Sequence, residues 1–111
     1  MRSPSELKLE IESRLEGYLS RDRDGIRHEL LSLFVKIRSL TIPQIYEKLQ
    51  EQFSISYHSI ASMVGIIASM VGIIASRIGI LHVRRNAEGT NTVYELKDQY
   101  VDVVMSVLGA M

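Results

Sequence analysis

The side chains of this sequence that are best suited to chemistry are the basic residues of its last third. Between residues 77 and 97, Lys and Arg outnumber Asp and Glu, although the whole chain has a formal net charge of zero. The cations are Arg77, Arg84, Arg85 and Lys97, and Asn86, Thr90 and Asn91 lie among them as neutral hydrogen-bonding residues. Such side chains bind phosphate groups. The segment is either a phosphate-binding surface or a solvated hairpin whose charges protect a strand edge.

Other patterns that could support catalysis or metal binding fail on spacing. His28, His58 and His82 are scattered, and the chain has no cysteine, so no metal-ligand pattern is present. The run DRDG at residues 22–25 is similar to part of a calcium loop, but Leu31 stands where the bidentate glutamate belongs, and a helix cap fits better. No nucleophile elbow or paired carboxylates can be identified. We therefore expect no enzyme, cofactor, metal or small-molecule ligand, and we expect His28 to face water.

Length and composition bound the fold and the compartment. The chain has 111 residues, enough for one domain with a real core, and its 46% of hydrophobic residues argue against disorder. Zero net charge removes the general argument for nucleic-acid binding, so any basic surface must be local. Because the N-terminus is charged and amphipathic, unlike a secretory signal, and no cysteine is present, we expect a cytoplasmic protein.

Two helices are predicted before residue 39. Apolar residues repeat every four positions from Leu7 to Leu19 and predict a first helix that ends near Ser20. A second apolar face runs from Ile26 to Ile37. We divide the single domain, residues 1–111, into an N-terminal helix (1–20), a central region (22–97) and a C-terminal helix (98–111).

A helix-turn-helix is predicted next. Thr41 and Gln44 form a capping-box pattern at the start of a helix from Ile42 to about Phe53. After a short turn, Ser56 can cap a third helix that begins at Tyr57. Two helices joined by so short a turn are typical of a helix-turn-helix.

The end of the chain predicts a hairpin and a last helix. Two strand-like runs, Ile80 to Arg85 and Thr92 to Lys97, flank a polar loop with Gly89 at its tip. An apolar helix comes last, from about Asp98 to Leu108. The fold class is therefore α+β and mainly helical, with a two-stranded hairpin between the third helix and the C-terminal helix.

The third helix contains a repeated heptad. SMVGIIA occupies residues 62–68 and again 69–75, and the looser copy SRIGILH stands at 76–82. An inserted heptad lengthens a helix by about 10.5 Å and rotates the residues after it by only about 20°, so a helix can accept it. The apolar stretch before Arg77 has about 17 residues and three serines, which is short for a membrane span, and we expect none.

A helix that is apolar on nearly all sides needs more cover than the rest of this chain can supply. We therefore expect a homo-oligomer; the alternative is ordinary core with a duplication that preserves the register. The expected self-association residues lie on the third and last helices: Gly65, Ile66, Gly72, Ile73, Tyr100, Val104 and Leu108.

The segment LTIPQIYEKLQEQFSISYHSIASMVG, followed by RIGILHVRRNAEGTNTVYEL, resembles the winged helix-turn-helix superfamily of DNA-binding domains. More narrowly, it is similar to a small archaeal winged-helix family without an established function. The resemblance covers about residues 22–108, and the chain departs from it in having two copies of the heptad.

The resemblance implies a transcriptional regulator that binds duplex DNA as a homodimer. The start of the third helix would enter the major groove and the wing would follow phosphates. The implied DNA-binding residues are Ser56, Tyr57, His58, Ser59, Arg77, Arg84, Arg85, Asn86, Asn91 and Lys97. The alternative is a winged helix used for protein assembly, which zero net charge and the isoleucines on the reading face favour.

Overall fold

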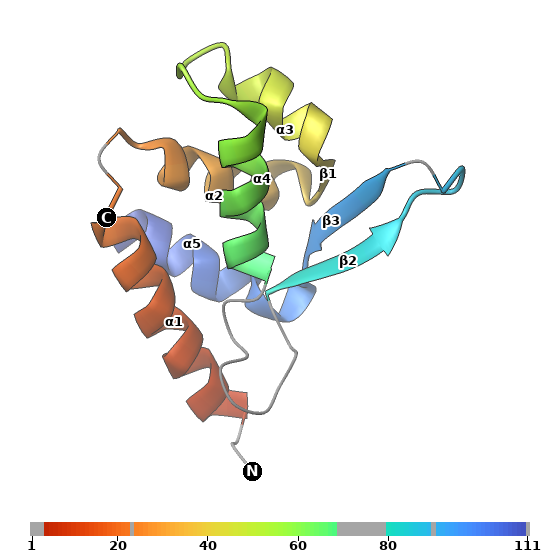
Figure 1. Ribbon diagram of the computed structural model, residues 1–111. Coiled ribbons are helices and arrows are strands. Elements are labelled where there is room, and N and C mark those ends of the chain that lie inside the picture. The colour runs from red at the N-terminus through yellow and green to blue at the C-terminus, as the bar shows by residue number, and fades with distance from the viewer. Residues whose placement is uncertain (1–3, 23, 69–79, 90, 111) are drawn as a thin grey trace.

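The computed structural model describes residues 4–22, 24–68, 80–89 and 91–110. Within these residues the fold is α+β, as the sequence predicts, with the helices gathered beside one end of an antiparallel sheet (Figure 1). The elements in chain order are α1 (Pro4–Ser20), α2 (Ile26–Ile37), β1 (Ser39–Thr41), α3 (Ile42–Leu49), α4 (Tyr57–Ala68), β2 (Leu81–Arg85), β3 (Thr92–Leu96), the 3-10 helix η1 (Asp98–Tyr100) and α5 (Val101–Ala110). The predicted extension of the third helix through the second heptad falls outside the described residues.

The first helices form where the apolar periodicity predicts them, and two residues of the polar segment between them shape the start of α2. Gly25 precedes α2 with a φ of 82°, a conformation that glycine adopts without steric cost, and it offers no side-chain cap. The carboxylate of Asp22 accepts a hydrogen bond from the main-chain nitrogen of His28 at 3.1 Å instead. The residues that are similar to a calcium loop thus cap a helix, which satisfies a free N–H of its first turn.

The prediction that His28 faces water is wrong. Its Nε2 lies 3.3 Å from the carbonyl oxygen of Leu108 near the end of α5, and the residue is only partly exposed. The last carbonyls of a helix have no partner within the helix, so a ring N–H from a neighbouring element stabilises them. His28 therefore joins α2 to α5.

The capping box at Thr41 is confirmed. The nitrogen of Gln44 donates to Thr41 Oγ1 at 3.3 Å, and the nitrogen of Thr41 donates to Gln44 Oε1 at 2.8 Å. The capped helix, α3, ends at Leu49, earlier than predicted, and the nitrogens of Gln52 and Phe53 then both donate to the carbonyl of Leu49 in the turn that follows. This turn brings Phe53 to the edge of the core.

The hairpin of β2 and β3 is confirmed, but the sheet has three strands rather than the predicted two. The strand order is β1-β3-β2, and both pairings are antiparallel. β1 comprises three of the four residues between α2 and α3, and it pairs Ser39 with Glu95 and Thr41 with Val93. The far end of the hairpin projects away from the helices (Figure 1).

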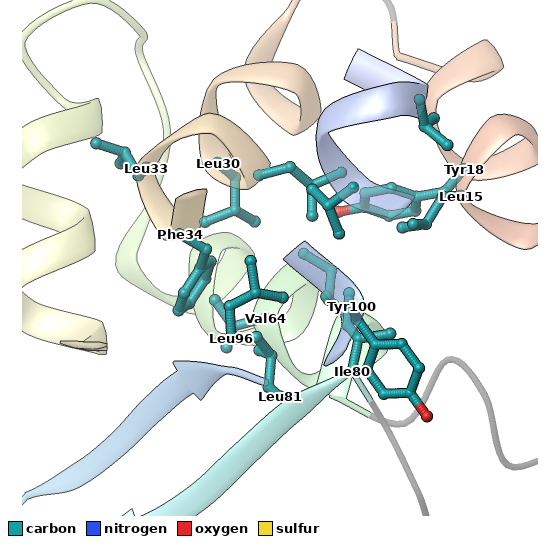
Figure 2. Packing of buried hydrophobic residues seen from close by; sticks show 14 of the residues in the cluster. Leu15, Tyr18, Leu30, Leu33, Phe34, Val64, Ile80, Leu81, Leu96 and Tyr100 are labelled. Atoms are coloured by element: carbon teal, nitrogen blue, oxygen red, sulfur yellow. The ribbon is translucent and has the colours of Figure 1, made fainter. Parts of the chain in front are cut away.

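One core cluster connects the described helices with the base of the hairpin. In Figure 2, Phe34 of α2 and Val64 of α4 converge with Leu96 of β3, while Leu15 and Tyr18 lie further along the cluster beside α5. Burying these apolar side chains supplies the main driving force for the fold. The hairpin is thus anchored at its base and free at its tip.

Two of the expected self-association residues, Tyr100 and Val104, are buried within the chain itself. Tyr100 is 1% exposed and Val104 is fully buried, and both belong to the core cluster of the chain itself. They are not available to a second copy, because η1 and α5 turn them inward against the other helices. Leu108 is partly buried and packs against the same cluster.

Candidate functional site

The start of α4 is organised by two serines. Ser56 Oγ accepts a hydrogen bond from the nitrogen of Ser59 at 3.1 Å, so the predicted cap is confirmed. The same hydroxyl donates to Ser59 Oγ at 2.9 Å. Both serine hydroxyls are thus used in part to begin the helix, and each keeps hydrogen-bonding capacity for a ligand because a hydroxyl has one donor and two acceptor positions.

Tyr57 is held at the surface by a second tyrosine. Its side chain is 47% exposed, and its ring meets that of Tyr46 of α3 with centroids 5.7 Å apart and planes at 61°. Edge-to-face packing of this kind stabilises ring orientation. The phenol of Tyr57 is therefore presented in a defined direction beside His58, which is also exposed.

One face of α4 is covered by the core and the other is exposed. Ile60, Val64 and Ile67 are fully buried at the spacing of a helix face. Side chains on the opposite side are exposed: His58, Ser59, Ser62 and Ile66, the last of these to 48%. Within the described part of the helix, a polar start and one isoleucine are open to a partner.

The hairpin carries two exposed arginines near its tip. Arg84 lies opposite Val93 and Arg85 lies opposite Thr92, and because side chains alternate along a strand the two guanidinium groups leave on opposite faces. Val83 beside them is 48% exposed. Few side chains of β2 are buried at this end of the sheet, so charged groups can be exposed on both of its faces.

The tip of the hairpin is closed by its own polar groups. The nitrogens of Asn86 and Gly89 donate to the carbonyls of Asn91 and Asn86, each at 2.9 Å, and Gly89 has a φ of 70°. The side-chain oxygen of Asn86 accepts from the nitrogen of Asn91 at 3.4 Å. Arg85 Nη1 donates to the carbonyl of Gly89 at 3.3 Å. Asn86 and Asn91 thus shape the turn, and Arg85 is held above it.

Lys97 lies apart from these arginines. It comes directly after β3 at the base of the hairpin, five residues after Thr92 and so about 17 Å from it along the strand. A shallow groove there is lined by Lys97 together with His82, Glu95 and Asp98, and partial burial lowers the pKa of Lys97. Since two carboxylates share this groove, Lys97 is less suited to phosphate than Arg84 and Arg85.

Apart from Lys97, the predicted DNA-binding residues that the structure describes separate into two groups: the start of α4, and the far end of the hairpin. Arg77, Gly72 and Ile73 fall outside the described residues, as does Thr90. Sequence reasoning missed the support from Tyr46 and the exposed apolar side chains Leu9 (66%) and Met105 (53%) on α1 and α5. A single exposed apolar residue leaves no distinctive signal in one sequence.

Among the described residues, no three His, Asp or Glu side chains lie close enough together to hold a metal ion. In the same part of the chain, no helix is long and apolar enough to cross a membrane.

Comparison with known proteins identifies the class to which the chain belongs. It matches the family described as "Protein of unknown function (DUF2551)" over residues 15–69 and 66–104, and it is a member of that family. The two matched segments overlap at residues 66–69, within the repeated heptad.

A relative in Archaeoglobus fulgidus, described as an uncharacterized protein, is 37% identical over 100 residues. The match covers 89% of this chain and 93% of that protein. No solved structure matches. Of the expected likeness to a small archaeal winged-helix family, the matches confirm a family of unknown function and an uncharacterised archaeal relative, and they do not address the winged helix.

Proposed function

We propose that the protein is a winged-helix regulator that binds duplex DNA as a homodimer. In this proposal α3 and α4 form the helix-turn-helix, and the hairpin of β2 and β3 is the wing. The order of elements supports the assignment, since the two helices of a helix-turn-helix precede a hairpin on one antiparallel sheet.

The observation that carries the proposal is that the polar start of α4 and the basic end of the hairpin are both exposed. Tyr57, His58 and Ser59 offer hydrogen-bonding groups at the end of α4 that would enter the major groove. Arg84 and Arg85 would contact phosphates. The chain as a whole has a formal net charge of zero, so the positive charge at the end of the hairpin is a local feature.

The test replaces both hairpin arginines with alanine and measures binding to random duplex DNA by fluorescence anisotropy at several salt concentrations. Loss of two phosphate contacts should weaken binding to all sequences and reduce the salt slope by about 2. The matched control replaces Lys8 and Lys36, which are exposed on α1 and α2, and should leave the slope unchanged. An unchanged slope in the arginine variant would remove the hairpin from the proposal.

A second function has its own support. Ile66 is exposed on α4, and Leu9 and Met105 are exposed on α1 and α5, two helices that pack against each other. Apolar side chains on these elements suit a protein-assembly module that self-associates and does not bind DNA. Solution mass of the chain and of a variant lacking residues 69–75 separates the two: assembly through the repeat predicts a smaller oligomer after deletion, without DNA binding by either form.

A further inference from the structure

The junction between α2 and β1 contains an arginine in an unusual backbone conformation. Arg38 has a φ of 75° and a ψ of −47°, and among the described residues it is the one residue other than glycine with a positive φ. Side chains with a Cβ are disfavoured there, and such conformations persist where the surrounding structure holds them. The residue that relieves this strain at no steric cost is glycine. The presence of arginine therefore calls for a role of its side chain.

The main chain of Arg38 is divided between a helix and a sheet. Its nitrogen donates to the carbonyl of Phe34 at 3.0 Å and closes the last turn of α2. Its carbonyl accepts from the nitrogen of Leu96 at 2.9 Å, which continues the antiparallel pairing of β1 with β3 by one residue beyond Ser39. In a regular antiparallel ladder a hydrogen-bonded pair exchanges two bonds. Here the second bond is missing, because the main-chain nitrogen of Arg38 donates to Phe34 of α2 and not to the carbonyl of Leu96.

The guanidinium group supplies the missing donor. Arg38 Nη2 donates to the carbonyl of Leu96 at 3.2 Å, and the same nitrogen forms an ion pair with the carboxylate of Asp98 at the start of η1. Leu96 is 1% exposed, so its carbonyl would otherwise lack both a ladder partner and ready access to water. One side chain thus completes the sheet and ties it to η1.

We infer that Arg38 is a positioning residue, whose guanidinium replaces a main-chain donor and fixes the direction in which the hairpin leaves the helices. Leu96 ends β3 and Asp98 begins the connection to α5, so both anchors lie at the base of the hairpin. Arg84 and Arg85 lie at the other end of the same hairpin, so the direction of the hairpin determines where they are placed. The inference about structure stands without DNA, and its consequence for DNA rests on the proposed function.

The test uses Arg38→Gly, because glycine accepts the positive φ and the variant should fold. Amide hydrogen exchange measured by NMR should show the Leu96 amide exchanging at least tenfold faster than in the native protein, with the amides of α1 and α5 changed less than twofold. Arg14→Ala, which removes a partly exposed arginine paired with Glu10, is the matched control and should leave Leu96 unchanged. Exchange at Leu96 within twofold of the native rate, or rising in step with α1 and α5, would overturn the inference.

Two conservative variants separate the carbonyl bond from the ion pair. Arg38→Lys keeps the charge but lacks the planar fork, so it should restore less than half of the lost protection. Asp98→Asn removes only an ion pair with an exposed carboxylate and should change exchange at Leu96 less than threefold. If Asp98→Asn matched the effect of Arg38→Gly, the ion pair and not the replaced donor would hold the hairpin, and the inference would fail.

The DNA readout is separate from the exchange readout. Arg38→Gly leaves Arg84 and Arg85 in place, so binding should weaken several-fold while the salt slope stays that of the native protein. A slope reduced by about 1 would mean that Arg38 contacts phosphate itself, which contradicts a positioning role. If the native protein does not bind DNA, the proposed function fails and the exchange experiment still decides the role of Arg38.

Discussion

The helical body, formed by α1, α2 and α5, differs from the hairpin of β2 and β3 in how far its side chains are buried. The body buries most of its apolar side chains and connects its helices by polar contacts such as that between His28 and Leu108. The hairpin buries Leu81 and Leu96 at its base and exposes four of the five residues of β2. Burial of apolar side chains therefore stabilises mainly the helical body, and the hairpin can carry exposed charge at little cost to the fold.

The largest effect should come from a cavity in the body. Phe34 is fully buried in the core cluster, so Phe34→Ala should lower the free energy of unfolding by about 3–5 kcal/mol. Val83→Ala, which trims an apolar residue 48% exposed on the hairpin, should cost less than about 0.5 kcal/mol. Urea denaturation measures both variants. Equal losses would break the distinction between the two regions.

A pH effect of intermediate size should arise in the body. Burial raises the pKa of Tyr18 to about 12; Arg27 opposes the shift and Asp22 adds to it. Between the unfolded and the folded pKa the unfolded chain loses a proton that the folded chain keeps, so stability must fall as pH rises through this window, by at most about 1.4 kcal/mol per pH unit.

Tyr18→Phe isolates this effect. Its hydroxyl is buried without a hydrogen-bond partner among the described residues, so the variant should be as stable as the native protein at neutral pH or more stable. Urea denaturation at about pH 8 and about pH 11 should show a smaller loss of stability in the variant. The lowered pKa of Lys97 contributes equally to both proteins and cancels. Identical losses would show that Tyr18 does not titrate differently in the folded state.

The smallest effect on stability should come from the hairpin tip. Replacing Arg84 and Arg85 with alanine should change the free energy of unfolding by less than about 0.5 kcal/mol, because both side chains are exposed. Thermal unfolding followed by circular dichroism measures the change. A loss above about 1 kcal/mol would mean that these arginines hold the fold, and any loss of DNA binding in the variant would then have a structural cause.

Local signals in the sequence were sufficient for the caps and for the hairpin. The Thr41 and Gln44 pattern and the Ser56 cap are contacts between residues three apart, so spacing alone predicts them. Gly89 at the tip likewise takes the positive φ that a tight turn requires.

Features that depend on distant partners could not be predicted in this way. β1 has three residues and exists as a strand because β3 pairs with it. The role of Arg38 requires the carbonyl of Leu96, 58 positions away. Tyr100 and Val104 lie on an apolar helix face that fits an interface as well as a core, and the packing of the other helices decides between them.

The most direct test of the central claim is the salt dependence of binding between the native chain and random duplex DNA, measured by fluorescence anisotropy together with solution mass. We expect a dimer whose affinity for DNA falls steeply as salt increases, because exposed arginines displace counterions from phosphates. No binding at low salt, by a folded protein of defined mass, would contradict it.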